Sequence, residues 1–171
     1  DSFGVGERLI TSASHPVFGG VYKLSGVEDD NGNVIPKIKI SENVAKITTP
    51  GFKDLYRLYD RSTSKAFADV VTLHDETIDD SRPYEIFDPD FVWKRKTVTN
   101  FRAVRIREQL FRGGQCIAKR RTLAELQSYC HRQVETLWDE VKRFENPHHY
   151  YVDLSPKLWN LKHQMISKYS N

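Results

Sequence analysis

Cysteine is scarce in this sequence, with only Cys116 and Cys130 among 171 residues. Two cysteines cannot form the disulfide scaffold of a small secreted domain, and neither has the neighbouring ligands that a metal cluster needs. The six histidines also lack the spacing of a zinc site. We therefore predict no metal site, and we expect buried or half-buried free thiols in a reducing cytoplasmic environment.

Long hydrophobic runs are also missing. No stretch of about 18 apolar residues occurs, which argues against a transmembrane helix and a membrane partner. The chain begins without Met and without the basic-then-apolar segment of a secretory signal. Because residues 3–6 resemble the middle of a structural element, we expect the chain to be part of a longer protein.

Common catalytic signatures are absent as well. The sequence has no Gly-x-Ser-x-Gly, no His-Glu-x-x-His and no glycine loop ending in Lys-Ser or Lys-Thr. Hydrophobic residues make up 39% and charged residues 29% of the chain, which is typical of a soluble, ordered domain rather than a disordered one.

Charge is unevenly distributed although the net charge is only +3. Residues 60–92 contain nine acidic and three basic side chains, whereas residues 94–121 contain ten basic side chains and one acidic side chain. Adjacent blocks of opposite sign favour contact with each other or with a partner subunit. The alternative is a stand-alone module whose 94–121 face binds RNA or an acidic protein.

Strand patterns dominate the first half of the chain. Alternating apolar residues and an Asn31-Gly32 turn signal predict an antiparallel meander over residues 21–75, with two strands at 55–59 and 67–73. The acidic residues 76–90 contain two prolines and are expected to form a connecting loop.

The second half is predicted to end in two helices. Thr122 and Glu125 form a capping-box pattern at the start of an apolar stripe over residues 122–145. Ser155-Pro156 is a typical helix start. The expected buried face of the second helix consists of Leu158, Leu161, Met165 and Ile166. Together these elements predict an α+β fold.

Gly4 and Gly6 are the first candidate binding residues. Glycines at a strand-to-helix turn allow backbone N–H groups to approach a phosphate. The pair lacks the third glycine of a dinucleotide fingerprint, so on spacing alone it fits a phosphate site or a plain structural turn.

Several ordered motifs together resemble one family. They are Phe-Gly-Val-Gly-Glu-Arg-Leu-Ile-Thr at 3–11, Gly-Gly-Val-Tyr-Lys-Leu at 19–24, Lys-Ile-Ser at 39–41, Lys-Ile-Thr-Thr-Pro-Gly-Phe-Lys at 46–53, Tyr-Arg-Leu at 56–58, Asn-Pro-His at 146–148 and Val-Asp-Leu-Ser at 152–155. Their order over nearly the whole chain resembles the C-terminal part of bacterial nicotinate phosphoribosyltransferases.

The resemblance implies a domain order and an activity. It implies a last strand and phosphate loop of an α/β barrel at 1–20, a mostly antiparallel β region with an acidic connecting loop at 21–115, and a helical region at 116–171. Family members join nicotinate to 5-phosphoribosyl 1-pyrophosphate, with coupled ATP hydrolysis and Mg²⁺, and form nicotinate mononucleotide and pyrophosphate in NAD salvage. The implied partners are the barrel of the same polypeptide and a second subunit in a homodimer, with no nucleic acid.

The resemblance also assigns binding roles to the N-terminal segment. It implies that Gly4, Val5, Gly6 and Glu7 form the phosphate loop, in which the N–H groups of Gly6 and Glu7 hold the phosphate. The Glu7 carboxylate would repel that phosphate and must point away. His15 is either a cation near the phosphates or a capping or surface residue. Catalytic residues are expected upstream, so the 171-residue chain alone should be inactive.

Overall fold

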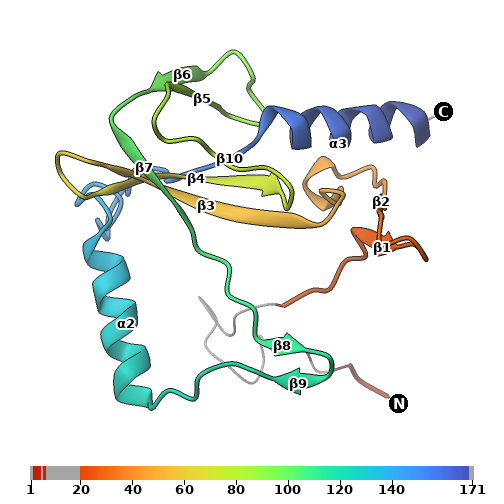
Figure 1. The fold of residues 1–171 in the computed structure, drawn as a ribbon, viewed down its shortest axis with the longest axis horizontal. Helices are drawn as coiled ribbons and strands as arrows, with labels where there is room; N and C mark the ends of the chain where they lie inside the picture. The colour runs from red at the N-terminus through yellow and green to blue at the C-terminus, as the bar shows by residue number, and fades with distance from the viewer. Residues whose placement is uncertain (1, 5, 7–19, 170–171) are drawn as a thin grey trace.

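A computed structural model describes residues 2–4, 6 and 20–169 of the chain, and these residues form an α+β structure with mixed sheets (Figure 1). The strands are Gly26–Glu28 (β1), Val34–Pro36 (β2), Lys53–Asp60 (β3), Ala66–Leu73 (β4), Tyr84–Phe87 (β5), Arg95–Val98 (β6), Phe101–Arg105 (β7), Phe111–Arg112 (β8), Gln115–Cys116 (β9) and Tyr151–Leu154 (β10). The helical elements are Val44–Lys46 (a 3₁₀ turn, η1), Leu123–Glu135 (α2) and Pro156–Tyr169 (α3).

A four-stranded sheet with the order β10-β4-β3-β7 forms the centre of the molecule. Strand β3 pairs antiparallel with both β4 and β7, whereas β10 pairs parallel with β4. The strands predicted at 55–59 and 67–73 lie within β3 and β4. A meander over residues 21–75 is not confirmed as one sheet, because β1 and β2 form a separate antiparallel pair.

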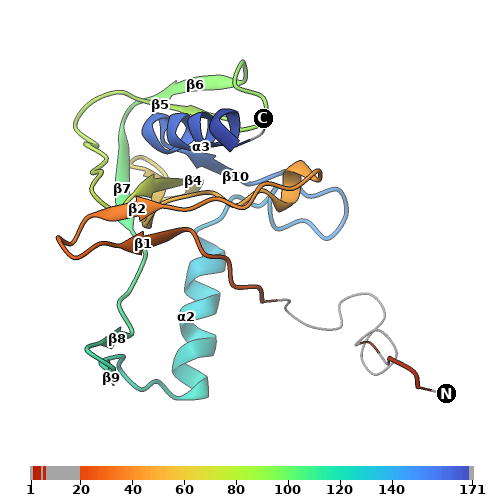
Figure 2. The same ribbon diagram turned by 90° about the vertical axis from the view of Figure 1, so that its right-hand side faces the viewer.

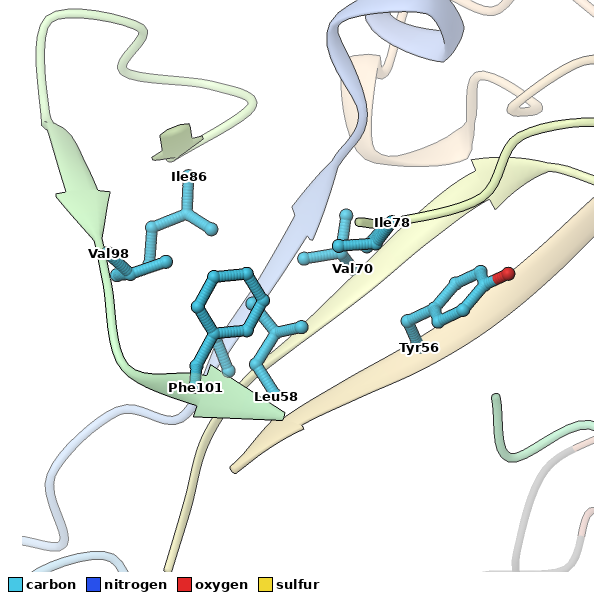
Figure 3. Close-up of a cluster of buried hydrophobic side chains, with 8 residues drawn as sticks. Tyr56, Leu58, Val70, Ile78, Ile86, Val98 and Phe101 are labelled. Carbon is cyan, nitrogen blue, oxygen red and sulfur yellow. The ribbon is translucent and has the colours of Figure 1, made fainter. Parts of the chain in front are cut away.

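The hydrophobic core lies between this sheet and the β5–β6 hairpin. Leu58 from β3 and Val70 from β4 meet Ile86, Val98 and Phe101 in one cluster of buried side chains (Figure 3). These side chains come from elements far apart in the sequence, so their burial fixes the hairpin over the sheet. The hairpin begins inside the segment predicted as a loop, because β5 spans residues 84–87.

Helix α3 lies on the same side of the sheet as the β5–β6 hairpin (Figure 2). The Leu158 N–H donates to the Ser155 hydroxyl at 3.2 Å, which confirms the predicted helix start. Leu158 is fully buried, and Leu161, Met165 and Ile166 are half-buried. The helix follows β10 directly, so the pairing of β10 with β4 places α3 along the sheet.

Helix α2 extends away from the other side of the sheet, near the β8–β9 hairpin (Figures 1 and 2). Its capping box is confirmed, since the Thr122 N–H donates to the Glu125 carboxylate at 2.7 Å and the Glu125 N–H donates to the Thr122 hydroxyl. None of the residues of α2 is buried. Within the described part of the chain, the part of the predicted apolar stripe on α2 is therefore exposed, whereas Leu137 and Val141, beyond the helix, are half-buried.

The predicted helix end at residue 145 is wrong, because α2 ends at Glu135. Tertiary hydrogen bonds replace the helical ones at this point. The Ala66 N–H donates to the Thr136 carbonyl at 2.8 Å, and the Lys65 ammonium group donates to the carbonyls of Glu135 and Leu137. These bonds attach the chain to the start of β4 and divert it from the helix axis.

The expected burial of the two thiols is also wrong, since Cys116 and Cys130 are both exposed. Cys116 lies in the short β8–β9 hairpin, and Cys130 lies on α2, so both are in the part of the molecule that extends from the sheet. Among the described residues, no helix combines the length and the apolar character needed to cross a membrane.

Candidate functional site

The predicted phosphate segment is only partly described. Gly4 and Gly6 are exposed, and a Cβ atom built on either would have no other heavy atom within 4 Å. Val5, Glu7 and His15 lie outside the described residues. The structure therefore leaves the phosphate loop as a prediction from the sequence.

Three buried aspartates lie in the central sheet, and they differ in how their charges are compensated. Asp54, Asp69 and Asp153 are between 2% and 7% exposed. A buried carboxylate is costly unless it is paired and hydrogen-bonded. The partners of each aspartate therefore indicate whether it serves the fold or remains available to a ligand.

Asp54 is compensated by the basic segment. Its carboxylate forms ion pairs with Arg105 at 3.2 Å and with Arg107 at 3.1 Å. The guanidinium group of Arg107 also lies 4.6 Å from the Phe52 ring centroid. This arrangement attaches residues 105–107 to the edge of the sheet, which is a structural role.

Asp69 is compensated even more fully. Arg57 donates two hydrogen bonds to its carboxylate, at 2.8 and 2.9 Å, and the Tyr150 hydroxyl donates a third at 2.9 Å. The bond to Asp69 raises the pKa of Arg57 above its usual range, and burial raises the pKa of Tyr150. The cluster connects β3, β4 and the segment before β10 as a structural unit.

Asp153 differs because its carboxylate accepts no hydrogen bond from any described residue. Burial, with a further contribution from the nearby Asp88, raises its pKa to about 6. It lies on β10, where it is 3% exposed, and it lines a pocket of about 350 Å³. Such a pocket reaches the lower end of the size range of small-molecule sites.

The pocket is formed where the β5–β6 hairpin crosses β10. The residues that line it are Ile86, Phe87, Asp88, Lys94, Arg95, Lys96, Tyr151 and Asp153. The wall therefore combines apolar side chains, two carboxylates and three cationic side chains. Carboxylates and cations that share one concave, partly apolar site are typical of ligand pockets.

The tip of the hairpin is held by a local turn. The Asp88 carboxylate accepts the N–H groups of Asp90 and Phe91 at 2.9 and 3.0 Å, and the Asp88 N–H donates to the Lys94 carbonyl. An Asx turn of this kind sets the direction of the chain. It places Asp88 and Lys94 together at one end of the pocket.

The basic segment uses part of its charge within the chain. Arg95 pairs with Glu85 at 3.2 Å, which joins the acidic and basic blocks as predicted, and Arg121 pairs with Glu108. With the two arginines bound to Asp54, four of its cations form internal pairs. Neither the comparisons below nor the contacts among residues 20–169 support the alternative of a stand-alone module for RNA or an acidic protein.

The described part of the chain contains no set of side chains that could bind the Mg²⁺ implied by the resemblance. No group of three or more His, Cys, Asp or Glu side chains there lies close enough to hold a metal ion. These residues do not fit the carboxylate and oxygen coordination that Mg²⁺ prefers.

Sequence reasoning did not identify Asp153 as a pocket residue. Its only signal is a charged side chain in the otherwise apolar segment Val152-Asp153-Leu154. The same pattern fits a strand with one wet face. The pairing of β10 with β4 and the crossing of the hairpin, both long-range events, place this carboxylate in a pocket.

Comparison with known proteins supports the resemblance. A family model described as nicotinate phosphoribosyltransferase C-terminal domain matches residues 52–162. The chain is 38% identical to the nicotinate phosphoribosyltransferase of Bacillus subtilis over 97% of its own length and 34% of the relative. Identity to the Caenorhabditis elegans enzyme is 29%, over 96% of this chain and 29% of the relative.

A solved structure has a similar fold. The crystal structure of human nicotinic acid phosphoribosyltransferase aligns with a TM-score of 0.62 and 24% identity, over 69% of this chain and 23% of that one. The chain spans about a third of the length of the curated relatives it matches. From the match to the family model over residues 52–162, we conclude that the chain belongs to the nicotinate phosphoribosyltransferase C-terminal domain family.

Proposed function

We propose that the chain is the C-terminal domain of an enzyme that joins nicotinate to 5-phosphoribosyl 1-pyrophosphate. The products would be nicotinate mononucleotide and pyrophosphate, formed with coupled ATP hydrolysis in cytoplasmic NAD salvage. The observation that carries the proposal is the 38% identity to the Bacillus subtilis relative over 97% of this chain.

The domain would contribute binding rather than the reacting groups. Phosphoribosyl transfer proceeds through a cationic, oxocarbenium-like state, for which positioning and charge stabilisation supply most of the catalysis. A phosphate held away from the reacting carbon can provide that positioning. In this proposal residues 1–20 form the end of a barrel, and the N–H groups of Gly6 and Glu7 bind the phosphate, with Gly4 and Val5 shaping the loop and His15 nearby.

The rest of the polypeptide is the proposed partner of helix α2. The helix and the adjacent hairpin expose many large apolar side chains: Leu110, Phe111, Ile117, Leu123, Leu126, Tyr129 and Val134. A 13-residue helix with no buried face is marginal in water by itself. Relatives contain about twice as much additional sequence as this chain covers, so we propose that the barrel region of the same polypeptide packs on this surface.

The remaining features of the proposal follow the family. Residues 1–20, 21–115 and 116–171 would be the barrel end, the β region and the helical region, and the enzyme would be a homodimer. Catalytic groups and the ATP and Mg²⁺ sites would lie in the preceding polypeptide. The 171-residue chain alone should then form no nicotinate mononucleotide.

The test is a glycine substitution in the full-length polypeptide. Gly6→Val would push a side chain into the phosphate loop, and we expect kcat/KM for phosphoribosyl pyrophosphate to fall about a hundredfold, or about 2.7 kcal/mol of transition-state binding. Gly20→Val is the matched control, because a Cβ atom at either glycine meets no other heavy atom within 4 Å, and Gly20 lies outside the proposed loop residues 4–7. Circular dichroism would check the fold of both variants. Unchanged activity of a folded Gly6→Val enzyme would contradict the phosphate-loop assignment.

A further inference from the structure

The pocket beside β10 contains a carboxylate that the chain itself leaves without a donor. Asp153 is only 3% exposed, and no described residue donates a hydrogen bond to its carboxylate. Asp54 and Asp69, the other buried aspartates of the sheet, each have arginine partners. The contrast leaves the Asp153 carboxylate, which lines the pocket, free to accept a hydrogen bond from a bound molecule.

Two cations lie on the wall of the same pocket without a carboxylate partner. Lys94 and Lys96 form no ion pair within 4.0 Å in the described residues, whereas Arg95, between them, is bound to Glu85 and to the Val92 carbonyl. Lys96 lies opposite Ile86 in the hairpin register. Residues opposite each other project from the same face, so Lys96 projects from the hairpin face that carries buried Ile86.

Apolar side chains line the same pocket as these charges. Ile86 and Phe87 are buried side chains of β5, and Tyr151 of β10 is half exposed. The volume of about 350 Å³ is large enough for a small ligand. Carboxylate, apolar and lysine side chains thus line one pocket.

We propose that this pocket binds a small zwitterion of the amino acid type with an apolar side chain. Its ammonium group would donate to the Asp153 carboxylate, its apolar side chain would contact Ile86 and Tyr151, and its carboxylate would pair with Lys96, which shares the hairpin face of Ile86. Charge complementarity supports both ends of the ligand. A simple anion would meet Asp88 and Asp153, and a simple cation would meet the lysines, so each would be held less well.

The experiment compares three probes that share one benzene ring. L-phenylalanine carries both charges, phenethylamine only the cation, and 3-phenylpropionate only the anion. Each is titrated into the full-length polypeptide to about 10 mM, and hydrogen exchange is followed by mass spectrometry over residues 84–98 and 150–155. This readout locates the ligand and does not depend on turnover, so it is separate from the test of the proposed enzyme activity.

We expect L-phenylalanine to protect both segments and to bind at least about tenfold more tightly than either half-probe. Asp153→Asn should weaken the binding of L-phenylalanine and phenethylamine but not that of 3-phenylpropionate, for which it removes a repulsive charge. Lys96→Met should weaken the binding of L-phenylalanine and 3-phenylpropionate but not that of phenethylamine. Because Lys96 is exposed, this variant is expected to fold even if Asp153→Asn does not. Glu108→Gln, a carboxylate-to-amide change outside the pocket lining, is the matched control and should bind like the wild type.

Three results would overturn the proposal. The first is no protection of either segment by L-phenylalanine at the highest concentration, as expected if Lys96 simply swings across to pair with Asp153. The second is a half-probe that binds as tightly as L-phenylalanine. The third is equal loss of L-phenylalanine binding in the Glu108→Gln control and the Asp153→Asn variant.

Discussion

Arg57 and Asp69 lie directly opposite each other on β3 and β4, and two hydrogen bonds of 2.8 and 2.9 Å join their side chains. The exposed fractions are 19% for the arginine side chain and 9% for the aspartate. Tyr150, just before β10, donates to the same carboxylate. One cross-strand pair therefore connects the centre of the sheet to the strand that carries the candidate pocket.

Removing one member of this pair should destabilise the fold strongly. Asp69→Ala leaves the Arg57 charge and the Tyr150 hydroxyl without their partner, and we expect a loss of about 3 kcal/mol in the free energy of unfolding. Urea denaturation measures this loss. The control is Glu108→Ala, which removes an exposed pair with Arg121 and should cost less than about 0.5 kcal/mol. Similar losses in the two variants would contradict the structural role of Asp69.

Gly51 should not tolerate a side chain. Its φ is +90°, and a Cβ atom there would lie 2.7 Å from Cδ2 of Leu73. Gly51→Ala combines backbone strain with a shift of Leu73, so we expect the free energy of unfolding to fall by about 1–3 kcal/mol. Gly20→Ala, with open space around its Cβ position, should remain close to the wild type. Thermal unfolding of both variants measures the difference in stability. A Gly51→Ala protein as stable as the wild type would contradict the predicted clash with Leu73.

Asp153 should make stability depend on pH in a specific direction. Its folded pKa of about 6 exceeds the unfolded value of about 3.9, so the folded state holds the proton more tightly. The contribution of Asp153 to the free energy of unfolding is then largest below about pH 4. It decreases by up to about 3 kcal/mol as pH rises to about 6, and it does not return at higher pH. The measurement is the free energy of unfolding of wild type and Asp153→Asn at several pH values. A difference between them that does not change from about pH 4 to 7 would contradict the raised pKa.

Phe101 should be essential to the core shown in Figure 3. Its side chain is fully buried beside Leu58, and Phe101→Ala leaves a cavity between the sheet and the hairpin. We expect a loss of about 3–5 kcal/mol in the free energy of unfolding. Phe91→Ala removes a ring that is 50% exposed and should cost less than about 1 kcal/mol. Chemical denaturation measures the free energy of unfolding of both variants. Equal losses would contradict the placement of Phe101 in the core.

The exposed face of α2 can be tested in the full-length polypeptide. Leu126→Lys would place a charge within the proposed contact with the barrel region, and we expect hydrogen exchange of residues 123–135 to increase at least about tenfold. Gln127→Lys is the matched control, because this neighbouring exposed residue is already polar. Equal exchange in the two variants would indicate that the apolar face of α2 is uncovered in the whole protein.

Local sequence patterns determined much of the secondary structure. The Asn31-Gly32 turn, the strands around 55–59 and 67–73, the Thr122 capping box and the helix start at Ser155 depend on residues within a few positions of each other. Ordered motifs also established the family resemblance, which the match over residues 52–162 confirms. The phosphate loop around Gly6 stays a prediction from the sequence.

Tertiary structure decided the features that depend on distant partners. Helix α2 ends at Glu135, where Lys65 and Ala66 donate hydrogen bonds to the backbone carbonyls of residues 135–137. No local sequence pattern encodes these long-range contacts. Sequence periodicity shows which residues are apolar, but not whether another surface covers them, so the exposed face of α2 was not predictable. The place of Asp153 in a pocket also depends on distant partners. It results from the pairing of β10 with β4 and from the position of the β5–β6 hairpin across β10.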